Sequence, residues 1–101
     1  MSRTVVTPRT KVRPKIERPR LYKVILLNDD YTPREFVVKI LRSVFRMGDE
    51  EAYRVMMTAH QRGACVVAVY TQEVAEAKAK DRTEAGHSAG YPLMFATEPE
   101  K

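Results

Sequence analysis

Two rigid elements follow each other closely in this chain, separated only by a polar turn. The apolar run Val24-Ile25-Leu26-Leu27 is short and β-branched at its start, which favours a buried strand. Thr32, Pro33 and Glu35 fit the N-cap, N1 and N3 positions of a helix, because Thr32 and Glu35 can form a capping box and Pro33 has no N–H that would lack a partner. The turn Asn28-Asp29-Asp30 is therefore predicted to hold three polar acceptors between a strand and a helix. Such a place could seat a small cationic group.

The residues alone leave a second interpretation of this turn open. Asn and Asp are ordinary turn residues, and their side chains can simply bond to their own backbone. His60, later in the chain, can likewise serve only as a cap at the C-terminus of a helix, where the helix dipole favours a positive charge. Local sequence does not decide between a structural turn and a binding site.

The positive charge of the chain is concentrated at its N-terminus. The net charge is +5, yet residues 1–20 hold seven basic residues against Glu17 alone, so the rest of the chain sums to −1. Three prolines interrupt the same segment, which has no apolar periodicity. We therefore expect residues 1–20 to form a disordered basic extension. A nucleic-acid partner is not expected, because the basic residues do not belong to the folded body.

Several other classes of protein are disfavoured. The longest apolar stretch, residues 64–70, is far shorter than the roughly 20 residues of a membrane span, and the N-terminus lacks the apolar segment of a secretory signal. Cys65 is the single cysteine, so no internal disulfide can form and a reducing cytoplasm is expected. The sequence has no local His pair and no two closely spaced cysteines, so no metal site is expected. No cofactor is expected either. Because Cys65 lies within an expected strand, its thiol is predicted to be inert, and we expect no enzymatic activity.

The apolar periodicities predict the order β-α-α-β-α-β, an α/β (α+β) sandwich in which a three-stranded sheet packs against helices. The expected strands are residues 21–27, 65–70 and 92–97, and the expected helices are residues 33–46, 50–62 and about fifteen residues from 72. Gly48 and Gly63 are expected to end the first two helices, and Asp49 to cap the second. The unbroken apolar run at 65–70 predicts a strand that is central or buried on both faces. The third helix has Val74 as its only large apolar anchor.

An apolar hollow is expected beside the polar turn. Met56 and Ala59 lie on the same helix as His60, within about one turn of it. Met56 is most simply a core residue, although methionine also lines adaptable pockets. A pocket that joins His60 and the turn to this apolar side would suit a protonated amine with a hydrophobic side chain attached. The free N-terminus of a protein whose first residue is large and hydrophobic has this chemistry.

Together these residues resemble the ClpS family, the bacterial adaptors of the N-end rule. The matching motifs are Tyr22-Lys23-Val24-Ile25-Leu26-Leu27-Asn28-Asp29-Asp30-Tyr31-Thr32-Pro33, Glu35-Phe36-Val37, Met56-x-x-x-His60 with Gly63, Val69-Tyr70-Thr71-x-Glu73-Val74-Ala75-Glu76-x-Lys78 and Pro92-Leu93. The resemblance covers residues 21–97, which are therefore expected to be a ClpS-like adaptor domain followed by a short tail at 98–101.

The resemblance implies a function and a set of site residues. Members bind proteins with N-terminal Phe, Leu, Tyr or Trp and deliver them to a Clp unfoldase, usually ClpA, for degradation by ClpP. The residues implied for the α-amino group are Asn28, Asp30 and His60, with Asp29 supporting the turn. Those implied for the side-chain pocket are Thr32, Arg34, Val37, Met56, Ala59 and Leu93. Glu73 and Lys78 are the residues implied for contact with the unfoldase N-domain, and the basic extension is implied in delivery.

Two positions depart from the family pattern. Arg34 stands where Met is usual at the mouth of the pocket, and Ala59 stands where a larger aliphatic residue is common. These departures predict a divergent, second ClpS paralogue with a changed residue preference. The alternative is a ribosomal-stalk-like scaffold or RNA-associated module, whose element order is similar but which would not need the acidic turn facing His60. We expect a monomer.

Overall fold

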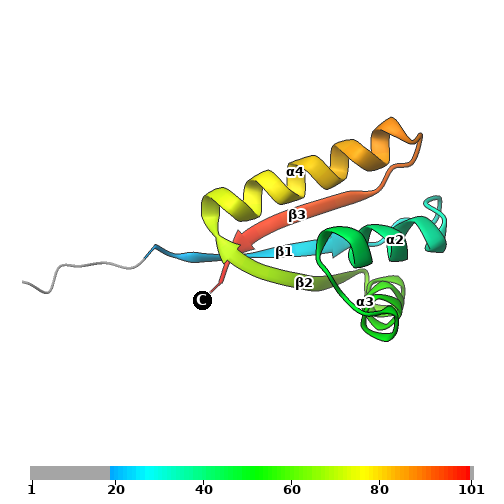
Figure 1. The fold of residues 1–101 in the computed structure, drawn as a ribbon, viewed down its shortest axis with the longest axis horizontal. Coiled ribbons are helices and arrows are strands. Elements are labelled where there is room, and N and C mark those ends of the chain that lie inside the picture. Colours follow the sequence, from blue (N-terminus) through cyan, green and yellow to red (C-terminus); the bar gives the residue numbers. More distant parts are fainter. Residues whose placement is uncertain (1–18, 101) are drawn as a thin grey trace, which may run out of the picture.

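The computed structural model describes residues 19–100, and the expected extension at residues 1–20 lies almost wholly outside this part. The observed elements are β1 (Leu21–Leu27), α2 (Arg34–Val44), α3 (Asp49–Arg62), β2 (Ala64–Thr71), α4 (Gln72–Ser88) and β3 (Met94–Pro99). The predicted β-α-α-β-α-β order is confirmed. Figure 1 shows α4 lying along the sheet, while α2 and α3 lie together near the end of β1.

The sheet is antiparallel, with β1 between β2 and β3. Leu26 of β1 pairs with Cys65 on one side and with Phe95 on the other. Helix α4 packs across the strands, α3 packs against β2 and β1, and α2 packs on α3. The largest fully buried side chains are Leu41, Leu93 and Val24. One hydrophobic core therefore joins the sheet, the helices and the segment before β3.

Helices α2 and α3 each bury one apolar stripe. The buried residues of α2 are Val37, Ile40 and Leu41, and those of α3 are Ala52, Val55, Met56 and Ala59. Their i, i+3, i+4 spacing is that of an amphipathic helix with one face on the core. In the part of the chain that is described, no helix is both long and apolar enough to cross a membrane.

The prediction for β2 was wrong. This strand lies at an edge of the sheet and is not central, and Val66 and Val69 remain 46% and 38% exposed. The register between β1 and β2 shifts between Val24 and Ile25, as in a β-bulge. A continuous apolar run does not distinguish a central strand from an edge strand, because that distinction depends on which strands pair with it.

The predicted capping box at the start of the first helix was also wrong. Helix α2 begins at Arg34, with Pro33 at the N-cap and no side-chain cap hydrogen bond. The Thr32 hydroxyl instead donates to a carboxylate oxygen of Asp29 at 2.9 Å. A carboxylate attracts this hydroxyl because charge-assisted hydrogen bonds are stronger than neutral ones. The amides of Phe36 and Val37 donate to the Pro33 carbonyl.

Other boundaries differ by a few residues. Gly48 is the N-cap of α3 and does not end α2, since the left-handed turn after α2 is made by Arg46 at φ 57°. Asp49 gives no side-chain cap to α3 and pairs with Arg42 at 2.7 Å. Gly63 ends α3 as predicted, at a φ of 93° that favours glycine.

Helix α4 does not use its large apolar residue as an anchor. Val74 is 42% exposed, and the residues of α4 that are buried are all small, namely Ala75, Ala79 and Gly86. Small side chains allow the helix to approach the sheet closely. Strand β3 spans Met94–Pro99 and not 92–97, so it includes the first two residues of the expected tail.

Candidate functional site

A backbone hydrogen bond fixes the end of β1 against the end of α3. The amide of Asn28 donates to the carbonyl of Gly63 at 3.0 Å. Gly63 in turn caps α3, with its amide donating to the carbonyl of Ala59 at 2.8 Å. His60 lies in the last turn of the same helix. These two bonds bring the polar turn after β1 and the His60 side chain together, although 32 positions separate Asn28 from His60.

The carboxylate of Asp29 organises the turn itself. One of its oxygens accepts from the amides of Tyr31 at 2.8 Å and Thr32 at 2.7 Å. The other oxygen accepts from the Thr32 hydroxyl. Thr32 is the one buried polar residue within residues 19–100. Both oxygens of the Asp29 carboxylate are therefore engaged within the turn.

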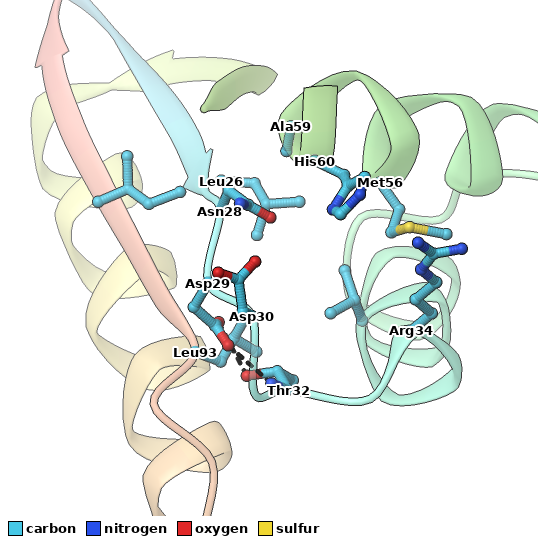
Figure 2. Close-up of a pocket in the computed structure, with 12 residues that line it drawn as sticks. Leu26, Asn28, Asp29, Asp30, Thr32, Arg34, Met56, Ala59, His60 and Leu93 are labelled. Carbon is cyan, nitrogen blue, oxygen red and sulfur yellow. Dashed lines mark hydrogen bonds between the residues drawn. The ribbon is translucent and has the colours of Figure 1, made fainter. Parts of the chain in front are cut away.

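Three polar side chains remain free to meet a ligand. Asn28, Asp30 and His60 are exposed, and their side chains make no hydrogen bond or ion pair with another residue of the described part. Figure 2 shows them around one space between the end of β1 and α3. A carboxylate, an amide oxygen and an imidazole nitrogen can together accept the N–H bonds of an ammonium group.

A cavity of about 150 Å³ opens beside these polar groups. Its lining contains all ten residues expected at the amine seat and the pocket, namely Asn28, Asp29, Asp30, Thr32, Arg34, Val37, Met56, Ala59, His60 and Leu93. Leu26 and Leu27 complete it and were missed by the sequence analysis. The signal for them was their position directly before the turn. Apolar cavities of about 150 Å³ are large enough to bind benzene, so the ring of a phenylalanine side chain fits this size.

The floor of the cavity depends on a close contact with α4. Leu93 is fully buried, and a Cβ added to Gly86 would lie 2.7 Å from the Leu93 Cβ and 3.2 Å from its Cδ2. Only a residue without a side chain therefore allows Leu93 to occupy its present position. The sequence analysis did not foresee this contact between Gly86 and Leu93.

The thiol of Cys65, the one candidate nucleophile of the sequence analysis, does not line the cavity. Cys65 is half-buried in β2, and burial raises the pKa of its thiol, although the positive charges of Arg54 and Arg62 act in the opposite direction. A raised pKa keeps the thiol protonated at neutral pH, and a protonated thiol is a poor nucleophile. Residues 19–100 contain no cluster of three or more His, Cys, Asp or Glu side chains suited to a metal ion.

The two residues implied for the unfoldase lie near the start of α4, apart from the cavity. Glu73 is exposed in the first turn of this helix. Lys78 is half-buried, with its Nζ 5.4 Å from the centroid of the Tyr70 ring. Such a cation–π contact holds the ammonium group close to the edge strand β2. The structure therefore places these two residues outside the pocket.

Comparison with known proteins gives one consistent family. A family model described as ATP-dependent Clp protease adaptor protein ClpS matches residues 17–96. An ATP-dependent Clp protease adapter protein ClpS 2 from Mesorhizobium japonicum is 58% identical over 101 residues, covering 100% of both chains. A ClpS 1 from Bradyrhizobium diazoefficiens is 59% identical over 101 residues, again with 100% of both chains covered. The existence of numbered paralogues among the relatives agrees with the expectation of a second paralogue.

A solved structure is also similar. Agrobacterium tumefaciens ClpS2 bound to L-phenylalaninamide matches with a TM-score of 0.80 and 61% identity, covering 82% of this chain and 100% of that chain. From the family model and from relatives that match over the whole length, this chain belongs to the ClpS family of Clp protease adaptor proteins.

Proposed function

We propose that this protein is an N-end rule adaptor. It binds proteins that begin with a free Phe, Leu, Tyr or Trp and delivers them to the ClpA unfoldase for degradation by ClpP. In this proposal Asn28, Asp30 and His60 hold the α-amino group, while the cavity receives the first side chain. Asp29 shapes the turn and does not itself meet the amine.

The observation that carries the proposal is one cavity whose lining joins the polar side chains of an amine seat to apolar side chains. The three polar side chains at the seat are unpartnered within residues 19–100, and the cavity is about 150 Å³. L-phenylalaninamide, the ligand of the similar solved structure, carries a free amine and a phenyl ring. An α-amino group with a pKa of about 7.7–8.0 is mostly charged at neutral pH.

The test is fluorescence anisotropy with labelled peptides that begin with Phe, Leu, Tyr, Trp, Ile or Met. Each peptide is made with a free and with an acetylated N-terminus, because acetylation removes the charge and two donors. Saturable binding of free Phe, Tyr, Trp or Leu peptides, lost on acetylation and in His60→Ala, supports the proposal. If no free N-terminus binds, or if acetylated peptides bind equally well, the proposal is wrong.

Gly86→Ala is expected to reduce the cavity. The new methyl group would push Leu93 towards the ligand, so peptides beginning with Phe or Trp should bind about tenfold more weakly. Overpacking of this kind costs about 1–3 kcal/mol of stability, partly offset by the roughly 1 kcal/mol gained when Ala replaces Gly in a helix. Titration calorimetry and thermal unfolding measure the two effects. Gly48→Ala is the matched control, since nothing lies within 4 Å of its added Cβ; equal behaviour of the two variants would contradict the prediction.

Arg34→Met is expected to change the ranking of first residues. Arg34 is exposed and lines the cavity, where its guanidinium can stack on an aromatic ligand ring, an interaction worth about 0.5–1 kcal/mol at exposed sites. Replacement by Met removes that term, so Phe, Tyr and Trp peptides should lose about two- to fivefold relative to Leu peptides. Competition binding gives the ranking, with Arg46→Met as the control at an exposed position outside the cavity. An unchanged ranking would show that Arg34 points into solvent in the complex.

Delivery requires a second surface, for which we propose Glu73 and Lys78. Glu73→Ala and Lys78→Ala should each weaken binding to the ClpA N-domain about tenfold while leaving peptide affinity unchanged, because both residues lie outside the cavity lining. Surface plasmon resonance with immobilised N-domain measures this effect. Glu84→Ala and Lys80→Ala, at exposed positions of the same helix, are the matched controls. Loss of binding in the controls alone would place the contact further along α4.

The same proposal assigns the protein to the cytoplasm, where Clp proteases act, as a monomer without catalytic activity or cofactor. The relatives that match over the whole chain are named adapter proteins. A peptide incubated with the protein alone should therefore remain intact, and should be degraded only when the unfoldase, ClpP and ATP are added. Cleavage by the protein alone would overturn this part of the proposal.

A further inference from the structure

A second hollow lies between α2 and α3, next to the cavity. Its lining combines hydrophobic and charged residues of the two helices, namely Arg34, Glu35, Val38, Lys39, Arg42, Tyr53 and Met56. We call it the helix groove; its volume is about 350 Å³. Arg34 and Met56 line both the helix groove and the cavity, so these two side chains form the wall between them. In Figure 2 both are drawn at the α2–α3 side of the pocket.

The helix groove offers apolar surface that the fold does not cover. Val38 is half-buried and Tyr53 is 54% exposed, while Met56 is almost completely buried at 5%. Two neighbouring residues of α2 line different hollows: Val37 lines the cavity and Val38 lines the helix groove. Arg42 at the rim is paired with Asp49 at 2.7 Å. The helix groove therefore combines charged groups with apolar surface, and this apolar surface is suited to a hydrophobic side chain.

We propose that the helix groove binds the second or third side chain of the same substrate whose first residue fills the cavity, and that it prefers a large hydrophobic residue there. This inference rests on the proposed function. Arg34 and Met56 line both the cavity and the helix groove, so a chain that is held by its first residue in the cavity and continues into the helix groove passes these two side chains. An extended chain advances about 3.3 Å per residue and alternates its side chains, so one of the next two side chains can cross this wall.

This continuity favours the substrate chain over other occupants. Because the helix groove shares Arg34 and Met56 with the cavity, a chain already held in the cavity can reach it without a separate association step, which a second copy of the protein or an independent partner would need. The consequence is a selectivity beyond the first residue: peptides with Leu at position two or three should bind about fivefold tighter than peptides with Ala there, the gain expected from partial burial of one leucine.

The experiment compares ligands that reach the helix groove with one that does not. L-phenylalaninamide serves as the short ligand, and Phe-Ala-Ala, Phe-Leu-Ala and Phe-Ala-Leu peptides with free N-termini serve as the long ones. Affinities are measured by calorimetry for the full chain and for Tyr53→Ala, Tyr53→Phe, Val38→Ala and Val66→Ala. Val66 is an exposed residue of β2 outside both linings and provides the matched control for Val38.

We expect Tyr53→Ala and Val38→Ala to remove the preference for leucine peptides and to leave the affinity for L-phenylalaninamide unchanged. Tyr53→Phe, which keeps the ring, and Val66→Ala should both keep the preference. If L-phenylalaninamide binds but leucine peptides gain nothing, or Tyr53→Ala weakens all ligands equally, the helix groove is not a binding site and the proposed function stands. If neither L-phenylalaninamide nor any of the Phe peptides binds, the proposed function fails and this inference fails with it.

Discussion

Asp30→Ala is expected to weaken binding of peptides with a free N-terminal Phe about a hundredfold without unfolding the protein. The Asp30 carboxylate is exposed and makes no hydrogen bond with another residue between 19 and 100, so its removal leaves no internal group unpaired. In the proposed complex it accepts from the ligand ammonium group. A charge-assisted hydrogen bond contributes about 1.5–3 kcal/mol, which corresponds to roughly 10- to 150-fold in affinity. Titration calorimetry with a Phe peptide measures the loss, and thermal unfolding measures stability.

The controls for Asp30→Ala separate a specific contact from a general change in charge. Asp81→Ala removes one exposed carboxylate from α4 and should leave affinity unchanged, because Asp81 lies outside the cavity lining. An acetylated Phe peptide should bind equally weakly to the native protein and to Asp30→Ala, since it has lost the charge that Asp30 recognises. An Asp30→Ala protein that retains native affinity would show that Asn28 and His60 alone hold the amine.

Asp29→Ala is expected to lose stability as well as ligand binding, whereas Asp30→Ala is expected to lose only binding. Both oxygens of Asp29 accept hydrogen bonds from the turn, two from the Thr32 amide and hydroxyl and one from the Tyr31 amide. Hydrogen bonds to a charged group contribute about 1.5–3 kcal/mol each and are not additive, so we expect about 2–4 kcal/mol of destabilisation. For a domain of this size that lowers Tm by roughly 10–20 °C. Chemical denaturation gives the free energy of unfolding.

Asp29→Asn provides the graded comparison for this prediction. The amide keeps one acceptor oxygen of similar geometry but loses the charge, so its stability should lie between those of the native protein and Asp29→Ala. Thr32→Val removes only the hydroxyl contact and should cost about 1 kcal/mol. If Asp29→Ala has the same Tm as the native protein but no longer binds the ligand, Asp29 must contact the amine directly.

Much of the site was predictable because its polar residues are close in sequence. Asn28, Asp29 and Asp30 are consecutive, and a strand followed by a helix forces the turn between them to the surface. His60 was placed near them through the family motif. The geometric reason, the bond from the Asn28 amide to the Gly63 carbonyl, joins two segments that no local pattern connects.

The errors in the sequence analysis have a common cause in competition between partners. Thr32 has the right residue type and spacing for a helix cap, but the Asp29 carboxylate is a stronger acceptor three residues away. Asp49 has the right type for a cap as well, yet it pairs with Arg42. Residue type states what a side chain can bond to, and the fold decides which of the available partners is nearest.

The order of strands and helices, the polar turn and the family resemblance were all predictable from the sequence, because periodicity, turn chemistry and motifs are local properties of the chain. The three-dimensional packing was needed to show that β1 is the central strand and β2 an edge strand, that the missing side chain of Gly86 leaves room for Leu93, and that a second groove adjoins the cavity. Each of these depends on contacts between distant segments. Such contacts are chosen by the packing of the whole core and not by any single stretch of residues.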